Sequence, residues 1–204
     1  MKKICVILLL GFLAILVLLG WFGYQSYSTG FSAKAEPNDL EVLIARQLRH
    51  LAIPIENRRL RNPLPLTQNL LKEARAHFAD HCASCHANNG SGQTAIGKNV
   101  YPKSPDLRLP DTQNMSDGEL FFIIQNGIRF TAMPAWGTGD PAKDSGSWQL
   151  VHLIRHLPSL TDEELQEMKS LNPKTKHDLE EEALIERFLQ GDDAAAGAAG
   201  AHHH

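Results

Sequence analysis

Residues 82–86 read Cys-Ala-Ser-Cys-His, and they stand between two stretches of opposite character. Before them, residues 67–81 have the apolar spacing of one helix face. The residues of that face are Leu70, Leu71, Ala74 and Phe78. After them, glycines and prolines indicate that residues 87–115 form a long irregular segment. Because a loop of this length inside a compact domain is usually functional, the sequence predicts a site at the pentapeptide.

Two cysteines separated by two residues and followed by a histidine are typical of c-type haem attachment. The two thiols add across the porphyrin vinyl groups, and the adjacent imidazole reaches the iron from one side. A thioredoxin-like pair would need a parallel sheet, whereas this chain shows no strand alternation. A zinc site would need four ligands, and the remaining cysteine, Cys5, lies in an apolar N-terminal run. The pattern therefore predicts one covalent haem c on Cys82 and Cys85, with His86 ligating the iron.

The second axial ligand is open on the residues alone. A methionine thioether raises the reduction potential, and a second histidine leaves it lower. The candidates outside the apolar N-terminal run are Met115, Met133, Met168, His152 and His156. Met168 lies on an apolar helical face and is expected to pack in the core, and Met115 stands at a helix start. Met133 lies in an irregular stretch that Pro134 stiffens, a backbone suited to aiming one side chain at a flat cofactor.

The combination of motifs over residues 66–158 resembles the monohaem class I cytochrome c family. The motifs that carry the resemblance are Cys82 to His86 after a helix with Phe78, Asn88-Asn89-Gly90-Ser91-Gly92, Asn126-Gly127-Ile128, Met133-Pro134-Ala135-Trp136 and a terminal helix. The resemblance implies an all-α fold, in which few short helices and long loops wrap around one haem. It also implies that His86 and Met133 are the two iron ligands.

Two further expectations follow from the resemblance. The helix over residues 67–81 should cross the helix over residues 148–157. The carbonyl of a proline should orient the His86 imidazole, and Pro102 and Pro105 both remain candidates for that role.

An apolar run indicates a membrane segment at the start of the chain. Residues 4–22 contain no charge, roughly the length that crosses a bilayer as a helix. The preceding Lys2 and Lys3 favour a cytoplasmic N-terminus. We therefore expect residues 1–27 to form a single-pass anchor in the cytoplasmic membrane, with the haem domain on the outer, periplasmic side. The alternative is a cleaved signal peptide, with Ala33-Lys34-Ala35 as the cleavage sequence.

The remaining segments are expected to flank the haem domain, residues 66–158. Residues 28–65 should form a linker and wrapping prefix, with a short helix over 40–51 and an extended segment over 53–66. Residues 159–191 should form an acidic helical extension, and residues 192–204 a disordered tail. Residues 66–158 carry eight basic and eight acidic side chains, whereas residues 159–204 carry four and eleven. The net charge of -3 gives no indication of nucleic-acid binding.

Several helix ends are marked by local signals. Ser116 with Glu119 forms a capping-box pattern for a helix that should stop at Gly127, and Thr161 with Glu164 forms a second such pattern. Ser147 is expected to cap the helix that Pro158 ends. A further acidic helix is predicted over residues 176–190.

These features predict an electron-transfer protein rather than an enzyme. It would act as an anchored carrier or as a cytochrome subunit of a membrane redox complex, with redox proteins and the membrane as its partners. The alternative is a haem enzyme or gas sensor with an open sixth iron position, which would require that Met133 does not bind the iron.

Overall fold

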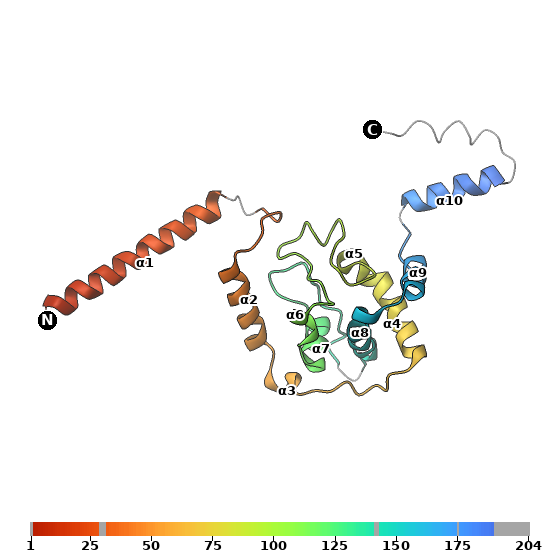
Figure 1. Cartoon of the computed structure of the whole chain (residues 1–204), viewed down its shortest axis with the longest axis horizontal. Coiled ribbons are helices and arrows are strands. Elements are labelled where there is room, and N and C mark those ends of the chain that lie inside the picture. Colours follow the sequence, from red (N-terminus) through yellow and green to blue (C-terminus); the bar gives the residue numbers. More distant parts are fainter. Residues whose placement is uncertain (1, 29–31, 141–142, 175, 190–204) are drawn as a thin grey trace.

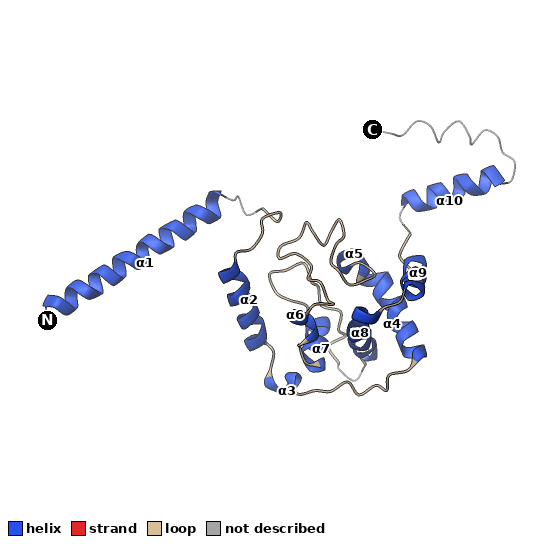
Figure 2. Cartoon of the chain, viewed as in Figure 1, coloured by secondary structure: helices blue, strands red, loops and turns tan. Residues whose placement is uncertain are grey.

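A computed structural model of the chain describes residues 2–28, 32–140, 143–174 and 176–189. Within these ranges the chain forms helices joined by loops and turns, without a β-strand (Figure 2). This confirms the predicted all-α class. The expected disordered tail, residues 192–204, lies outside the described residues.

Two helices from opposite ends of the haem domain form its centre. Helix α4 (Gln68–His81) packs on α8 (Ser145–His156) more extensively than any other two described elements pack together. The apolar stripe predicted for residues 67–81 is buried there against α8, with Phe78 of α4 and Val151 of α8 almost completely buried. The crossing that the family resemblance implied is therefore present.

The start of α8 differs from the prediction. The helix begins at Ser145, and Asp144 rather than Ser147 occupies the N-cap position. Ser147 lies buried in the first turn. The Asp144 side chain does not cap α8, because it accepts hydrogen bonds from the Thr138 backbone N–H (2.9 Å) and from Gln125. A contact with the preceding loop therefore places the helix start earlier than the local signal indicates.

Helix α7 (Asp117–Asn126) completes the core beside α8. Its predicted capping box is present, with the Ser116 hydroxyl accepting from the Glu119 N–H at 3.2 Å. The Phe121 ring stacks on Trp148 of α8, with ring centroids 3.9 Å apart. The backbone leaves the helix at Gly127, as predicted, with a positive φ of 64°.

The prefix contains one more helix than expected. Helix α2 (Asp39–Ala52) begins after its N-cap Asn38, and α3 (Ile55–Arg58) follows as a single turn within the segment predicted to be extended. Pro54 is compatible with this turn because it precedes the first helical residue, where a missing N–H removes no helical hydrogen bond. Helix α3 packs closely on α7, since a Cβ at Gly118 would collide with the Asn57 carbonyl.

The prefix is hydrogen-bonded to the haem domain beyond α3. The Asn62 amide donates to the Trp148 carbonyl at 2.8 Å, and the His152 ring bonds the Leu64 carbonyl at 2.9 Å. Residues 59–67 thus run over the surface of α8 before α4 begins (Figure 1).

Two single-turn helices interrupt the long segment after α4. Helix α5 (Ala83–His86) lies within the haem-attachment motif, and α6 (Pro110–Gln113) lies in the part predicted to be irregular. Pro110 occupies the first turn of α6, a position that proline favours. The prediction that no helix forms between residues 87 and 115 was therefore wrong at α6.

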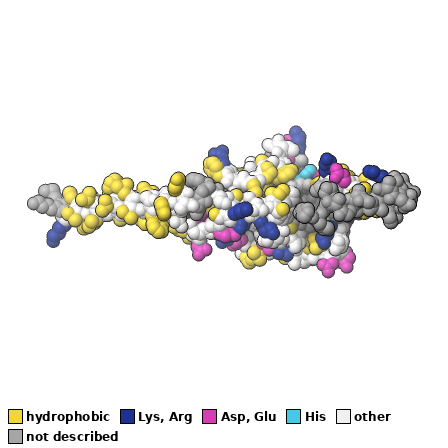
Figure 3. All heavy atoms as spheres, turned by 90° about the horizontal axis from the view of Figure 1, so that it is seen from above, with side chains coloured by type: hydrophobic (Ala, Val, Ile, Leu, Met, Phe, Trp, Pro, Cys, Tyr) yellow, Lys and Arg dark blue, Asp and Glu magenta, His cyan; other side chains and the backbone are white. Residues whose placement is uncertain are grey.

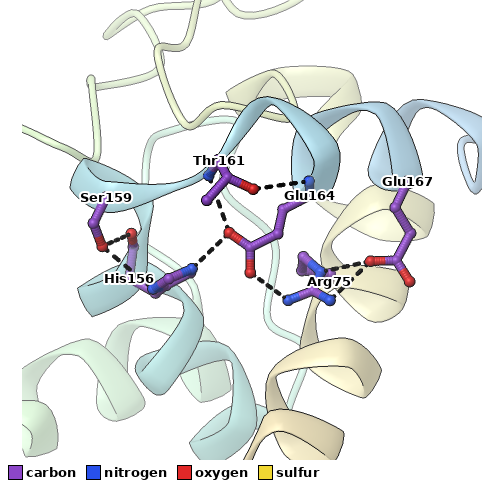
Figure 4. A network of polar contacts seen from close by, with 6 residues as sticks. All are labelled: Arg75, His156, Ser159, Thr161, Glu164 and Glu167. Atoms are coloured by element: carbon purple, nitrogen blue, oxygen red, sulfur yellow. Dashed lines mark hydrogen bonds and ion pairs between the residues drawn. The ribbon is translucent and has the colours of Figure 1, made fainter.

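The C-terminal extension begins against the core. After a turn of 3-10 helix (Leu157–Ser159), α9 (Asp162–Ser170) inserts the completely buried Met168 into the core, as expected for that methionine. An ionic network between Arg75, His156, Glu164 and Glu167 joins α9 to α4 and α8 (Figure 4). Helix α10 (Lys176–Leu189) follows and leaves Leu179 and Ile185 exposed.

Helix α1 (Lys2–Ser28) extends away from the helices of the haem domain (Figure 1). Its segment Lys3–Gln25 is long and apolar enough to cross a membrane, and none of its side chains is buried within the protein. Hydrophobic side chains cover its length (Figure 3). Length and composition fit both an anchor and a signal sequence.

Candidate functional site

The three residues of the attachment motif lie on one turn of backbone. Cys82 is the C-cap of α4, and its N–H donates to the Phe78 carbonyl at 2.8 Å. The Cys82 carbonyl in turn accepts from the N–H groups of Cys85 at 3.1 Å and His86 at 2.9 Å. Helix α4 therefore presents both thiols and the imidazole at its C-terminal end.

The two cysteines are free and partly exposed. Burial, reinforced by the neighbouring Cys85, raises the pKa of Cys82 to about 12. Cys82 is thus a neutral thiol at physiological pH. In the described ranges, no three His, Cys, Asp or Glu side chains form a group that could hold a metal ion.

The His86 imidazole is held in a sparsely hydrogen-bonded environment. Burial lowers the pKa of His86, and the carbonyl of Pro105 acts in the opposite direction. Nδ1 is buried and has no hydrogen-bond partner among the described residues. A proton on Nδ1 facing Pro105 would leave the Nε2 lone pair free for a metal. Of the two candidate prolines, Pro105 is therefore the one whose carbonyl lies at the imidazole.

The loop that follows the attachment motif folds back onto the backbone of the motif. The Gly92 N–H donates to the His86 carbonyl at 2.8 Å, and the Thr94 hydroxyl donates to the Cys85 carbonyl at 3.3 Å. A Cβ at Gly97 would collide with the Cys85 carbonyl, so this close approach requires glycine. The glycines that the sequence marked as loop residues thus bring Pro105 back to His86.

Met133 lies in the loop that follows α7. Its carbonyl accepts from the Ile128 N–H at 3.1 Å, and its own N–H donates to the Thr131 hydroxyl at 3.1 Å. The Trp136 N–H then donates to the Ile124 carbonyl at 3.0 Å. These bonds fold the loop back over the end of α7 and hold the half-buried Met133 at a defined position.

One aromatic contact connects this loop to the attachment motif. The Trp136 ring lies 5.3 Å from the ring of His81, which directly precedes Cys82. Trp136 is also only three residues from Met133. The segments that carry the predicted ligands, far apart in sequence, are thus neighbours in space.

The other candidates for the second axial ligand have different environments. Met168 is buried in the core, and the His152 ring bonds the Leu64 carbonyl. His156 bonds Glu164 at 2.8 Å. Met115 lines an open pocket of about 280 Å³ whose other walls are polar or belong to proline. Those walls are His50, Pro110, Asp111, Asn114 and Glu119.

One polar cluster was not anticipated from the sequence. His50 of α2 bonds Glu119 of α7 through Nδ1 at 2.9 Å and the Arg58 guanidinium through Nε2 at 2.8 Å. The three residues belong to different helices, and no local pattern relates them. Only the docking of the prefix brings them together.

The donor set fits a haem. Two thiols on one turn suit the covalent attachment, while an imidazole with a free Nε2 and a thioether suit the iron. Residues 69–154, from α4 to α8, match the family model described as cytochrome C oxidase, cbb3-type, subunit III. No curated protein matches the chain at a significant level. The match spans all four predicted haem-binding residues, and it agrees with the helical fold and the attachment motif: this part of the chain is a c-type cytochrome domain.

Proposed function

We propose that the protein transfers single electrons through one covalent haem c with His86 and Met133 as iron ligands. It would do so as a membrane-anchored carrier or as a cytochrome subunit of a membrane redox complex, with the haem domain on the outer face. The observation that carries this proposal is the single turn on which Cys82, Cys85 and His86 lie, with the Pro105 carbonyl behind the imidazole.

Each residue of the site has a distinct task. When bound, haem c supplies a reversible change between ferrous and ferric iron. Cys82 and Cys85 would hold the haem through thioether bonds, and His86 would bind its iron through Nε2. The Pro105 carbonyl keeps the Nδ1 proton in place and so maintains the orientation of the imidazole.

Met133 determines whether the site is closed. Its thioether would fill the second axial position, which leaves no place for a substrate and favours electron transfer over catalysis. The hydrogen bonds from Ile128 and to Thr131 restrain the loop, so the ligand need not move when the oxidation state changes. Restraint of this kind keeps the reorganisation energy small.

Two observations support a role beside a membrane complex. The described helix α1 is long and apolar enough to serve as an anchor, and the matched family model is named for an oxidase subunit. The balanced charge of the haem domain indicates no strong electrostatic steering of a diffusing partner. A haem domain that is tethered to the membrane or fixed in a complex agrees with the apolar helix and with the balanced charge.

Substitution of the proposed sixth ligand tests this function. Met133→Ala should open the iron, so that the reduced protein binds carbon monoxide rapidly, and should lower the reduction potential. The oxidised variant should also lose the weak sulfur-to-iron band in the near infrared. These properties are measured by absorption spectroscopy, flash photolysis and redox titration of the purified full chain.

Met115→Ala is the matched control, because Met115 lies outside the Met133 loop. It should retain the near-infrared band and the potential of the unsubstituted protein. Rapid carbon monoxide binding by the unsubstituted reduced protein, without the sulfur band, would instead favour the open-iron enzyme or sensor.

A further inference from the structure

Helix α2 contacts the haem domain through polar side chains. Arg46 forms an ion pair with Asp111 of α6, and His50 bonds Glu119 of α7 at 2.9 Å. Near the start of the helix, Glu41 accepts a hydrogen bond from the Tyr101 hydroxyl. These contacts join α2 to three separate segments of the domain.

Five large apolar side chains of α2 lie on its other side, whereas Val42 is half-buried. The five are 48–70% exposed, and none of them packs in the core. These residues are Leu40, Leu43, Ile44, Leu48 and Leu51. At about 3.6 residues per turn, these five residues project away from the face that carries Val42, Arg46 and Arg49. That face turns toward the domain, because Val42 and Arg49 are half-buried and Arg46 pairs with Asp111. An amphipathic helix normally buries its apolar stripe in its own domain, so the orientation of α2 is reversed.

The chain itself indicates what covers this face. Ten residues, 29–38, separate the end of α1 at Ser28 from the start of α2 at Asp39. At about 3.5 Å per residue, they let α2 move no more than about 35 Å from the end of α1. If α1 crosses a membrane, α2 is thus held near its surface at all times, a high effective concentration that no untethered partner has.

We propose that the apolar face of α2 lies in the interfacial layer of the membrane that α1 crosses. A leucine-rich face opposite a charged face is the pattern of helices that lie in the plane of that layer. Since the polar face of α2 is bonded to α6 and α7, such binding would fix the orientation of the haem domain relative to the bilayer. The inference rests on the membrane location in the proposed function.

Retention after release of the anchor tests this inference. The full chain with bound haem, carrying a specific protease site between residues 29 and 38, is reconstituted into vesicles of phosphatidylethanolamine and phosphatidylglycerol. After cleavage, the vesicles are sedimented and the haem absorbance of pellet and supernatant is measured. The cleaved haem domain should remain with the vesicles, and high salt should not release it, because the contact is apolar.

Paired variants assign the retention to α2. Leu48→Glu combined with Leu51→Glu should lower the partition coefficient about a hundredfold, because burying each leucine contributes about tenfold. Leu179→Glu is the control, since this leucine of α10 is comparably exposed, at 53%. It should leave retention unchanged.

The other outcomes overturn the inference. Release of the unsubstituted domain as a monomer shows that the face does not bind lipid, and release as a dimer shows that a second copy covers it. Release by salt shows that charge holds the domain. Equal retention of the double variant shows that another segment binds. The haem spectrum of each fraction separates these outcomes from a failure of the proposed electron-transfer site.

Discussion

Two glycines with positive φ show how single residues position the proposed Met133 ligand. Gly127 (φ 64°) and Gly139 (φ 86°) both have a positive φ, but their surroundings differ. A Cβ at Gly127 would lie 2.6 Å from the Met133 carbonyl, whereas a Cβ at Gly139 would have no neighbour within 4 Å among the described residues. The first glycine therefore permits both a turn and a close backbone contact, and the second only a turn.

Replacement by alanine should separate these two roles. Gly139→Ala should cost about 1–2 kcal/mol of stability, the strain of a left-handed residue. Gly127→Ala should cost more, because the backbone of residues 133–135 must also move. It should further weaken the near-infrared sulfur band, which Gly139→Ala should preserve. Urea unfolding and absorption spectra provide both measurements, and equal effects on the band would contradict the restraint assigned to Gly127.

At the scale of elements, the ionic network of Figure 4 explains how α9 attaches to the core. Arg75 of α4 is only 7% exposed and bonds both Glu164 and Glu167 of α9 at 2.8 Å. Burial by itself would raise the pKa of Glu164. The Thr161 N–H, His156 and Arg75 together outweigh burial and lower this pKa below its ordinary value of 4.5.

This lowered pKa predicts a pH dependence for the docking of α9. A carboxylate whose pKa is lower in the folded state stabilises the fold above its unfolded pKa, and the contribution disappears as pH falls through the folded pKa. Glu164→Gln should therefore destabilise the protein by about 1–3 kcal/mol at pH 7. The difference from the unsubstituted protein should shrink as pH falls below about 4.5 in urea titrations.

Glu182→Gln is the matched control, because its ion pair with Lys174 in the C-terminal extension is largely exposed. Loss of an exposed pair should change stability by less than about 1 kcal/mol. A pH-independent effect of Glu164→Gln would show that packing, rather than charge, holds α9.

At the scale of the whole molecule, the two interpretations of α1, a retained anchor and a cleaved signal peptide, predict mature chains of different mass. An uncleaved α1 keeps the domain on the membrane, whereas cleavage after Ala35 would produce a chain that begins at Glu36. Because α1 contains a 23-residue apolar segment, longer than an ordinary signal core, we expect the anchor to be retained. The mass of the protein purified from membranes should equal the full chain plus one haem. A mass that corresponds to residues 36–204 plus haem would contradict this expectation.

The structure also shows which parts of the fold were predictable. The capping boxes at Ser116 and Thr161 were correct because each depends on residues three positions apart. The predicted start of α8 was wrong because Asp144 bonds Thr138 in the preceding loop. The turn of α3 was missed because it is stabilised by packing on Gly118, some sixty positions away.

The sequence by itself determined the chemistry of the proposed site, because both thiols and the imidazole are neighbours in the chain and their spacing alone identifies haem attachment. Only the tertiary structure decided that Pro105 rather than Pro102 faces His86, since a folded loop must bring that carbonyl back. It also decided the orientation of α2. The leucine pattern predicts a helix, but its apolar face is turned outward because Glu41, Arg46 and His50 bond to distant segments of the domain.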